Sequence, residues 1–248
     1  MSALTNVPYF SHPETVLSYA RMVGKVGLWR SELLLGERYI PKEARILELG
    51  CGAGRIAFGL WQQGWKNITA TDFSRPMIEM AHEINKARKT GIIFSVADAT
   101  QLPFADAEFD AVIFGFNGLM MIPSLASRKK VLREMWRVLC LGGVALFTGH
   151  ERDTARNAAH WLQESERWEQ GKHDPELEIF GDYNHHTPEG KMYIHASQKS
   201  ETAALVLCCG FEILLSEMRS SIAVENAAVH EFSDDTRFWL IRKNGNSF

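Results

Sequence analysis

Between residues 45 and 149 the chain alternates short apolar runs with helical patterns, and this alternation restricts the folds open to it. The apolar runs predict strands at 45–49, 67–72, 92–98, 109–116 and 144–149. Patterns with three- and four-residue spacing predict helices at 55–63, 74–87 and 125–139. Ser74 as an N-cap and Pro76 in the first turn support the second helix. Strands alternating with helices form βαβ units, so we predict a doubly wound, mostly parallel α/β sheet.

The flanking regions complete one predicted domain that spans residues 1–248. Residues 1–41 form a helical N-terminal extension, and residues 42–149 form the core. Residues 150–196 are polar and rich in Trp and His; residues 197–248 return to the sheet, with a helix at 198–209 and strands at 211–218 and 236–243. Long connections in compact domains are usually functional lids or disordered linkers, and the aromatic residues of 150–196 favour packing. We therefore expect this insertion to cover a substrate.

Composition narrows the partners and the compartment. The chain has 248 residues and a net charge of −3, which argues against nucleic acid as a partner without excluding a local basic patch. It has no N-terminal secretion signal and no apolar run of membrane length. We expect a cytoplasmic protein with no membrane contact, and the oligomeric state is left open.

Three alternating glycines, Gly50, Gly52 and Gly54, connect the first predicted strand to a helix, as nucleotide sites require. Asp72 ends the next strand, where an acidic residue can accept hydrogen bonds from ribose hydroxyls. Dinucleotide and adenosylmethionine sites share both features. A dinucleotide fingerprint counted from Gly50 needs Gly or Ala at position 55, which is Arg55 here. No Gly-Lys-Ser/Thr follows either, so an oxidoreductase and a P-loop protein are the weaker interpretations.

Four segments in order now resemble a known family: ELGCGAG, TATDFSRPMIEMA, VADATQLPFADAEFDAVIF and LREMWRVLCLGGVALF. They are similar to the successive motifs of class I S-adenosylmethionine-dependent methyltransferases, of the small-molecule type with an "LPF…FD" signature. The resemblance covers roughly residues 44–148. It implies a Rossmann-like sheet of seven strands with an antiparallel last strand at 236–243. It also implies S-adenosyl-L-methionine as cofactor and S-adenosyl-L-homocysteine as product.

The resemblance assigns roles to residues of the core. The Gly50–Gly52 stretch and Glu48 would face the amino-acid end of the cofactor, Asp72 the ribose, and Asp98 the adenine amino group. Arg55 either reaches the cofactor carboxylate or lies solvated on its helix. The complete predicted cofactor set is Glu48, Gly50, Cys51, Gly52, Gly54, Asp72, Phe73, Asp98, Ala99 and Phe116.

The catalytic and substrate residues are less constrained by the sequence. Alignment of the reactants supplies much of the catalysis, and a base is needed only for a protonated acceptor. His150 follows the fifth strand and should lie near Asn117, where it either accepts a proton or only hydrogen-bonds backbone. The predicted substrate residues are Asn117, Tyr183, His185 and His186. Adjacent histidines in an extended chain point to opposite faces, and no His-x₃-His pair occurs, so we expect no metal site.

These observations favour a methyltransferase that acts on a small molecule. The alternatives are a methyltransferase for tRNA or rRNA bases, and a catalytically silent protein that binds adenosylmethionine. The acceptor and its attacked atom cannot be read from the motifs. The N-terminal helices, with Tyr9, Phe10 and Tyr19, either fold over the cofactor or form a plain outer pair.

Overall fold

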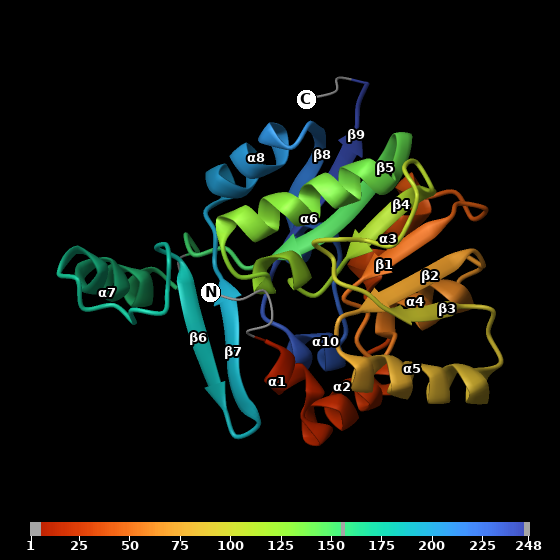
Figure 1. The fold of residues 1–248 in the computed structure, drawn as a ribbon, viewed down its shortest axis with the longest axis horizontal. Helices are drawn as coiled ribbons and strands as arrows, with labels where there is room; N and C mark the ends of the chain where they lie inside the picture. Colours follow the sequence, from red (N-terminus) through yellow and green to blue (C-terminus); the bar gives the residue numbers. More distant parts are fainter. Residues whose placement is uncertain (1–5, 155–156, 246–248) are drawn as a thin grey trace.

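A seven-stranded sheet runs through the computed structural model, which describes residues 6–154 and 157–245 (Figure 1). The strand order is β3-β2-β1-β4-β5-β9-β8. Neighbours from β3 to β5 pair in parallel, and β9 pairs antiparallel with both β5 and β8. The bounds are β1 Ile46–Leu49, β2 Ile68–Asp72, β3 Ile93–Val96, β4 Phe109–Phe114, β5 Leu139–Gly149, β8 Phe211–Met218 and β9 Arg237–Lys243. The predicted Rossmann-like sheet with an antiparallel last strand is confirmed, and that strand lies inside the sheet.

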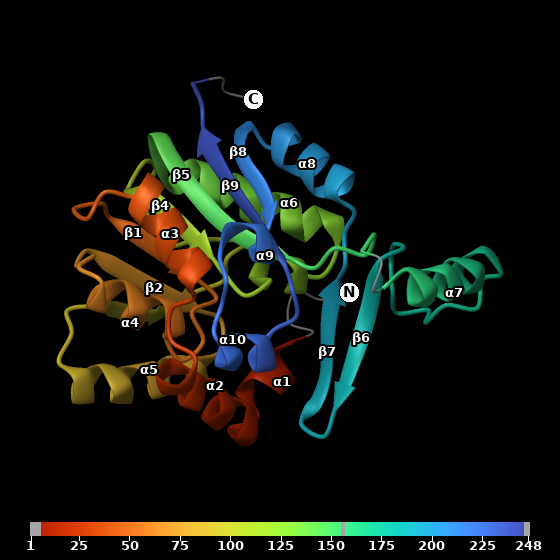
Figure 2. The same ribbon diagram turned by 180° about the vertical axis from the view of Figure 1, so that it is seen from behind.

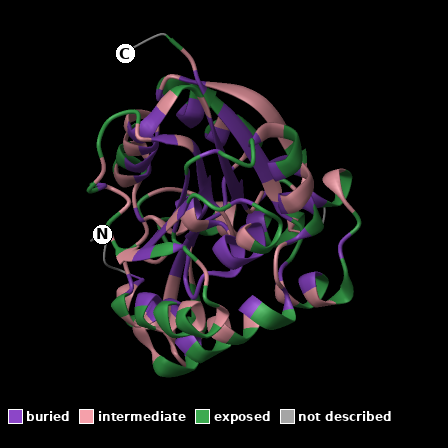
Figure 3. Cartoon of the chain, turned by 90° about the vertical axis from the view of Figure 1, so that its right-hand side faces the viewer, coloured by how far each residue is buried: buried purple, intermediate pink, exposed green. Residues whose placement is uncertain are grey.

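Helices cover both faces of the sheet because successive strand residues point to opposite sides. On one face, α6 (Leu125–Val138) and α8 (Lys199–Cys208) pack against Leu47 and Val112. On the other, α3 (Arg30–Tyr39), α4 (Arg55–Gln62) and α5 (Arg75–Arg88) pack against Ile46 and Ile113. The two layers are visible from the front and from behind (Figures 1 and 2). Buried residues concentrate in the sheet and on the inner sides of the helices (Figure 3).

The fifth strand differs from its prediction. It begins at Leu139 and not at 144, so the preceding helix ends at Val138. Gly142 and Gly143 therefore lie inside the strand instead of stopping the helix. Gly142 has φ +79°, and the register with β4 shifts between Phe109 and Ala111. The two glycines thus lie at an irregularity in the sheet. In the sequence, the same two glycines after a helical pattern are indistinguishable from a helix end.

The N-terminal helices are α1 (Val7–Ser11) and α2 (Pro13–Lys25), and they pack against α4 and α5. Ser74 ties this extension to the core. Its hydroxyl donates to the carbonyl of Phe10 at 2.8 Å and also accepts the backbone N–H of Met77 as the N-cap of α5. The predicted cap is confirmed, and it also holds α1 at the end of β2.

The insertion contains α7 (Ala158–Glu169) and a hairpin of β6 (Asp182–Thr187) and β7 (Gly190–His195). Helix α7 projects away from the rest of the molecule, whereas the hairpin runs along the side of the molecule (Figures 1 and 2). Strand β7 packs against α1 and against η1 (Gly118–Met121), a short 3₁₀ helix after β4. Two more short helices, α9 (Arg219–Ile222) and α10 (Ala227–Phe232), connect β8 to β9. Over the described ranges 6–154 and 157–245, no helix combines the length and apolarity needed to cross a membrane.

Candidate active site

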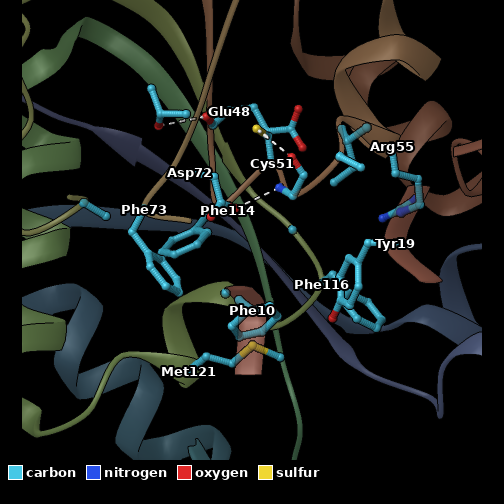
Figure 4. Close-up of a pocket in the computed structure, with 18 of the residues that line it drawn as sticks. Phe10, Tyr19, Glu48, Cys51, Arg55, Asp72, Phe73, Phe114, Phe116 and Met121 are labelled. Carbon is cyan, nitrogen blue, oxygen red and sulfur yellow. Dashed lines mark hydrogen bonds between the residues drawn. The ribbon is translucent and has the colours of Figure 1, made fainter. Parts of the chain in front are cut away.

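A cavity of about 260 Å³ opens at the carboxyl ends of β1, β2 and β4, where ligands bind in open α/β sheets (Figure 4). We call it the cofactor pocket. Gly54 is absent from its lining and instead forms the N-cap of α4, with φ +93°. The structure brings the other nine predicted cofactor residues together around this pocket: Glu48, Gly50, Cys51, Gly52, Asp72, Phe73, Asp98, Ala99 and Phe116.

The glycine loop needs glycine for two separate reasons. Gly50 has φ +59°, a left-handed conformation that side chains with a Cβ rarely adopt. A Cβ on Gly50 would also lie 2.7 Å from Cε2 of Phe114. The loop therefore turns immediately after β1 while it stays against the aromatic ring beneath it.

Asp72 holds the glycine loop from the neighbouring strand. Its Oδ2 accepts the backbone N–H of Gly52, and its Oδ1 accepts that of Ser74, both at 2.8 Å. Burial raises the pKa of Asp72 to about 6, although these two hydrogen bonds oppose the shift. Each carboxylate oxygen can accept a second hydrogen bond, so both oxygens of Asp72 remain available to ribose hydroxyls.

Glu48 is buried below the loop with an unsatisfied oxygen. It is 2% exposed, and its Oε2 has no hydrogen-bond partner within residues 6–154 and 157–245. Burial raises the pKa of Glu48 to about 8, and the charges of Glu32 and Asp72 add to the rise while Arg55 opposes it. A buried carboxyl without a partner is costly, so this oxygen is well suited to receive a cationic ligand group.

Arg55 lines the cofactor pocket; of its two predicted roles the structure excludes the solvated one, and contact with the cofactor carboxylate stays a prediction. It is buried, and its guanidinium forms two hydrogen bonds with Glu32 of α3, at 2.6 and 2.8 Å. A third bond joins it to the carbonyl of Gly27 at 2.7 Å, and it lies over the ring of Trp29. Arg55 is therefore not solvated. Its charge is balanced by a carboxylate that lies far away in the sequence.

The N-terminal helices contribute a wall of the pocket. Phe10 of α1 and Tyr19 of α2 line it, and both point into it in Figure 4. Phe10 packs edge-on against Phe73 with ring centres 5.8 Å apart. Asn6 fastens this wall, because its Nδ2 donates to the carbonyls of Met121 and Tyr193 at 2.9 and 3.0 Å. Of the two arrangements predicted for this extension, the structure shows the one over the pocket.

Several lining residues carried no signal in the sequence. Phe232 of α10 stacks on Phe116 with ring centres 4.5 Å apart and planes 10° apart. The β8–β9 connection therefore forms part of the pocket wall. Met121 and Ile122 enter from η1. A six-residue helix has too little periodicity to be recognised, and these contacts depend on tertiary packing alone.

Asp98 lines the pocket and is exposed. Its Oδ1 accepts both the backbone N–H and the hydroxyl of Thr100, each at 2.8 Å. The turn leaves the other carboxylate oxygen for a ligand donor.

His150 and Asn117 are neighbours, as predicted, but neither lines the cofactor pocket. The Nδ2 of Asn117 lies 3.0 Å from Nε2 of His150. The backbone N–H of Asn117 donates to the hydroxyl of Thr148. Asn117 is buried with φ +62°, and Thr236 Oγ1 lies 2.9 Å from its Oδ1. Burial lowers the pKa of His150, so its imidazole is neutral near pH 7. The pair supports the chain that leads from Phe116 to Gly118.

The predicted substrate residues of the insertion lie outside the cofactor pocket. Tyr183 is half-buried on β6 and packs edge-on against Trp161, and burial raises its pKa to about 12. His185 and His186 are exposed on the same strand. Their roles in substrate binding stay predictions. In the described part of the chain, no cluster of three His, Cys, Asp or Glu residues could hold a metal.

Comparison with known proteins shows a likeness over the core of the chain. Residues 46–143 match the family model described as a methyltransferase domain. Demethylmenaquinone methyltransferase from Thermus thermophilus is 37% identical over 117 residues, 46% of this chain and 50% of that protein. The matched stretch thus spans about half the length of such curated relatives.

Solved structures extend the likeness to the whole fold. A SAM-dependent methyltransferase from Methanosarcina mazei superposes with a TM-score of 0.69 at 21% identity, covering 88% of this chain and 99% of that one. The cyclase SpnF gives the same TM-score at 19% identity, covering 99% and 98%. At such identities the likeness shows the fold alone.

Residues 46–143 thus match a methyltransferase domain, and the chain has the fold of the SAM-dependent methyltransferase from Methanosarcina mazei. The cofactor that this match and fold imply is S-adenosyl-L-methionine. The residues present fit it, because the cavity lies directly against the loop glycines Gly50 and Gly52 and Glu48 offers an unpaired oxygen to its ammonium group.

Proposed function

We propose that this protein transfers a methyl group from adenosylmethionine to a small-molecule acceptor. The observation that carries the proposal is the convergence of three separate motifs on one pocket. Glu48 and Asp72 come from two strand ends, and Phe116 from a third. When bound, the cofactor supplies a methyl group on a sulfonium sulfur that is already activated for attack.

The walls beyond the glycine loop suit an acceptor with an uncharged reactive part. Phe116, Phe232 and Met121 are apolar, and the charge of Arg55 is balanced by Glu32. Because these walls come from α1, α2, η1 and α10, the pocket is closed by the chain itself. That closure favours a small acceptor over a nucleic acid, and it keeps water from the reacting atoms. One relative is named a demethylmenaquinone methyltransferase, and an apolar acceptor is consistent with that name.

His150 is our candidate base for an acceptor that arrives protonated. Its lowered pKa keeps the imidazole in the proton-accepting form near pH 7. It contacts Asn117, which adjoins the lining residues Phe116 and Gly118. For the insertion 150–196, we propose that the hairpin supports the substrate side of the pocket through its packing on α1 and η1.

Labelled cofactor distinguishes this proposal from its alternatives. The protein is incubated with methyl-labelled adenosylmethionine and either a cell-metabolite extract or total RNA. We expect label in a compound of low molecular mass. Label in RNA would instead support the nucleic-acid alternative, and binding without any transfer would support a silent protein.

A further inference from the structure

A second cavity, of about 370 Å³, lies between the start of α6, helix α8 and the hairpin. Met120 of η1 lines this second cavity, whereas Met121 and Ile122 line the cofactor pocket. The short helix η1 therefore stands between the two cavities. No lining residue of one is a lining residue of the other, so the second cavity needs a separate explanation.

His195 presents an unpaired nitrogen to the second cavity. The residue is 4% exposed, and its Nδ1 lies 2.8 Å from Oδ1 of Asp182. The same oxygen accepts the hydroxyl of Tyr193 at 2.6 Å. A carboxylate can only accept, so Nδ1 carries the hydrogen and Nε2 has the free position. Among residues 6–154 and 157–245, Nε2 has no hydrogen-bond partner, and His195 is one of the residues that line the cavity.

Two cations of α6 border the same space. Arg128 is 1% exposed, and its Nη1 donates to the carbonyl of Ile122 and to the hydroxyl of Tyr193 at 3.0 and 2.9 Å. Its Nη2 is buried and has no partner in the described part of the chain. Lys129, the next residue, lines the cavity and forms no ion pair with any described carboxylate. Lys129 therefore brings a positive charge to the cavity that no described carboxylate pairs with directly.

The acidic groups nearby offset the two arginines and leave the charge of Lys129. Glu201 of α8 lies 2.7 Å from Arg152, and the Asp182 carboxylate is joined to Arg128 through the hydroxyl of Tyr193. Burial lowers the pKa of His195, and the charge of Arg128 lowers it further, whereas the bond to Asp182 opposes both. Cys208 also faces the cavity from α8. The rest of the wall is mostly apolar, with Leu125, Ile179 and Leu205, and the hydroxyls of Ser197 and Thr202 in it lie 2.7 Å from each other.

We propose that the second cavity binds the carboxylate or phosphate group of a small, partly apolar molecule, with Lys129 and His195 as its polar contacts. An anion there would pair with the free ammonium of Lys129 and accept a hydrogen bond from a protonated Nε2 of His195. The apolar wall would cover the rest of the molecule. This site is independent of the methyl-transfer proposal, because it uses no residue of the cofactor pocket.

Calorimetric titration with inorganic phosphate and, separately, with hexanoate tests the site. We expect one of the two probes to bind, hexanoate if the ligand is a carboxylate with an apolar body and phosphate if it is a phosphate ester. Lys129→Gln should weaken that binding at least about 10-fold, the effect expected for one charge-assisted contact. Lys130→Gln is the matched control, because Lys130 is exposed on the same helix and does not line the cavity. Failure of both probes at about 10 mM, or equal binding by the two variants, would overturn the proposal.

The titration of His195, followed by NMR of its imidazole, gives a second readout that does not depend on a variant. With the bound probe at saturation, the pKa of His195 should rise, because the anion favours the imidazolium. An unchanged pKa would remove His195 from the site. Lys129→Gln should leave adenosylhomocysteine affinity unchanged; a parallel loss of that affinity would place the probe in the cofactor pocket and contradict a separate site.

Discussion

The carboxylate of Asp72 accepts the backbone N–H of Gly52 at 2.8 Å, so the end of β2 fixes the glycine loop that follows β1. The residue predicted to bind ribose therefore also shapes the surface on which the cofactor's amino-acid end would lie. Loss of Asp72 should then affect binding through two routes, a direct contact and the position of the loop.

Asp72→Ala should weaken adenosylhomocysteine binding by about 1.5–3 kcal/mol, the range for hydrogen bonds to a charged group. Calorimetry on the folded variant measures this loss. Glu79→Ala is the control, since Glu79 is exposed on α5 and remote from the pocket lining. Unchanged affinity in a folded Asp72→Ala variant would contradict the assignment.

Glu48→Gln should change the pH dependence of stability. Burial raises the pKa of Glu48 from 4.5 to about 8, so the folded protein retains a proton that the unfolded chain loses at lower pH. The stability from this group is fully present below about pH 4.5 and is lost as the pH rises to about 8. Glutamine does not titrate, so wild type should lose stability relative to Glu48→Gln over that interval. Urea unfolding at several pH values measures the difference, and a difference that is constant with pH would refute the explanation.

Gly50→Ala should destabilise the fold by about 1–2 kcal/mol for the left-handed backbone, with a further cost from contact with Phe114. Gly24→Ala is the matched control, because a Cβ there meets nothing within 4 Å and Gly24 lies within α2. That control should gain up to about 1 kcal/mol from helix propensity. Urea unfolding compares the two, and equal stabilities would argue against a conformational requirement at Gly50.

Phe10→Ala should lower adenosylhomocysteine affinity several-fold, because the ring forms part of the pocket wall and packs on Phe73. Leu17→Ala, a change at an exposed residue of α2, should have no effect. Both affinities are measured by calorimetry at matched thermal stability. If deletion of residues 1–20 also left affinity intact, the N-terminal helices would be a plain outer layer after all.

His150→Ala should lower turnover about 100-fold or more, with cofactor affinity close to wild type, once an acceptor is known. Because burial lowers the pKa of His150, wild-type turnover should rise with pH and level off below the ordinary imidazole range. His160→Ala on exposed α7 is the control. Full turnover in His150→Ala would leave alignment of the reactants as the only source of catalysis.

The core could be predicted because its signals are local. The spacing of apolar residues in 46–49 and 68–72, the alternating glycines and the cap at Ser74 each act over a few residues, and the structure retains all of them. The same holds for Asp72, which a strand end places beside the loop.

The rest of the site depends on contacts between distant segments. Arg55 pairs with Glu32 across two helices, and Phe232 reaches Phe116 from a helix of six residues. Neither contact leaves a periodic pattern. The hairpin of the insertion had a local signal, the turn residues Pro188 and Gly190, but its strands are too polar to show the usual alternation.

A calorimetric titration of the wild-type protein with adenosylmethionine, adenosylhomocysteine and NADH shows which nucleotide the glycine loop binds. We expect both adenosyl compounds to bind one site per chain and to compete with each other, and we expect NADH not to displace them. Tight binding of NADH, with no binding of either adenosyl compound, would contradict this expectation.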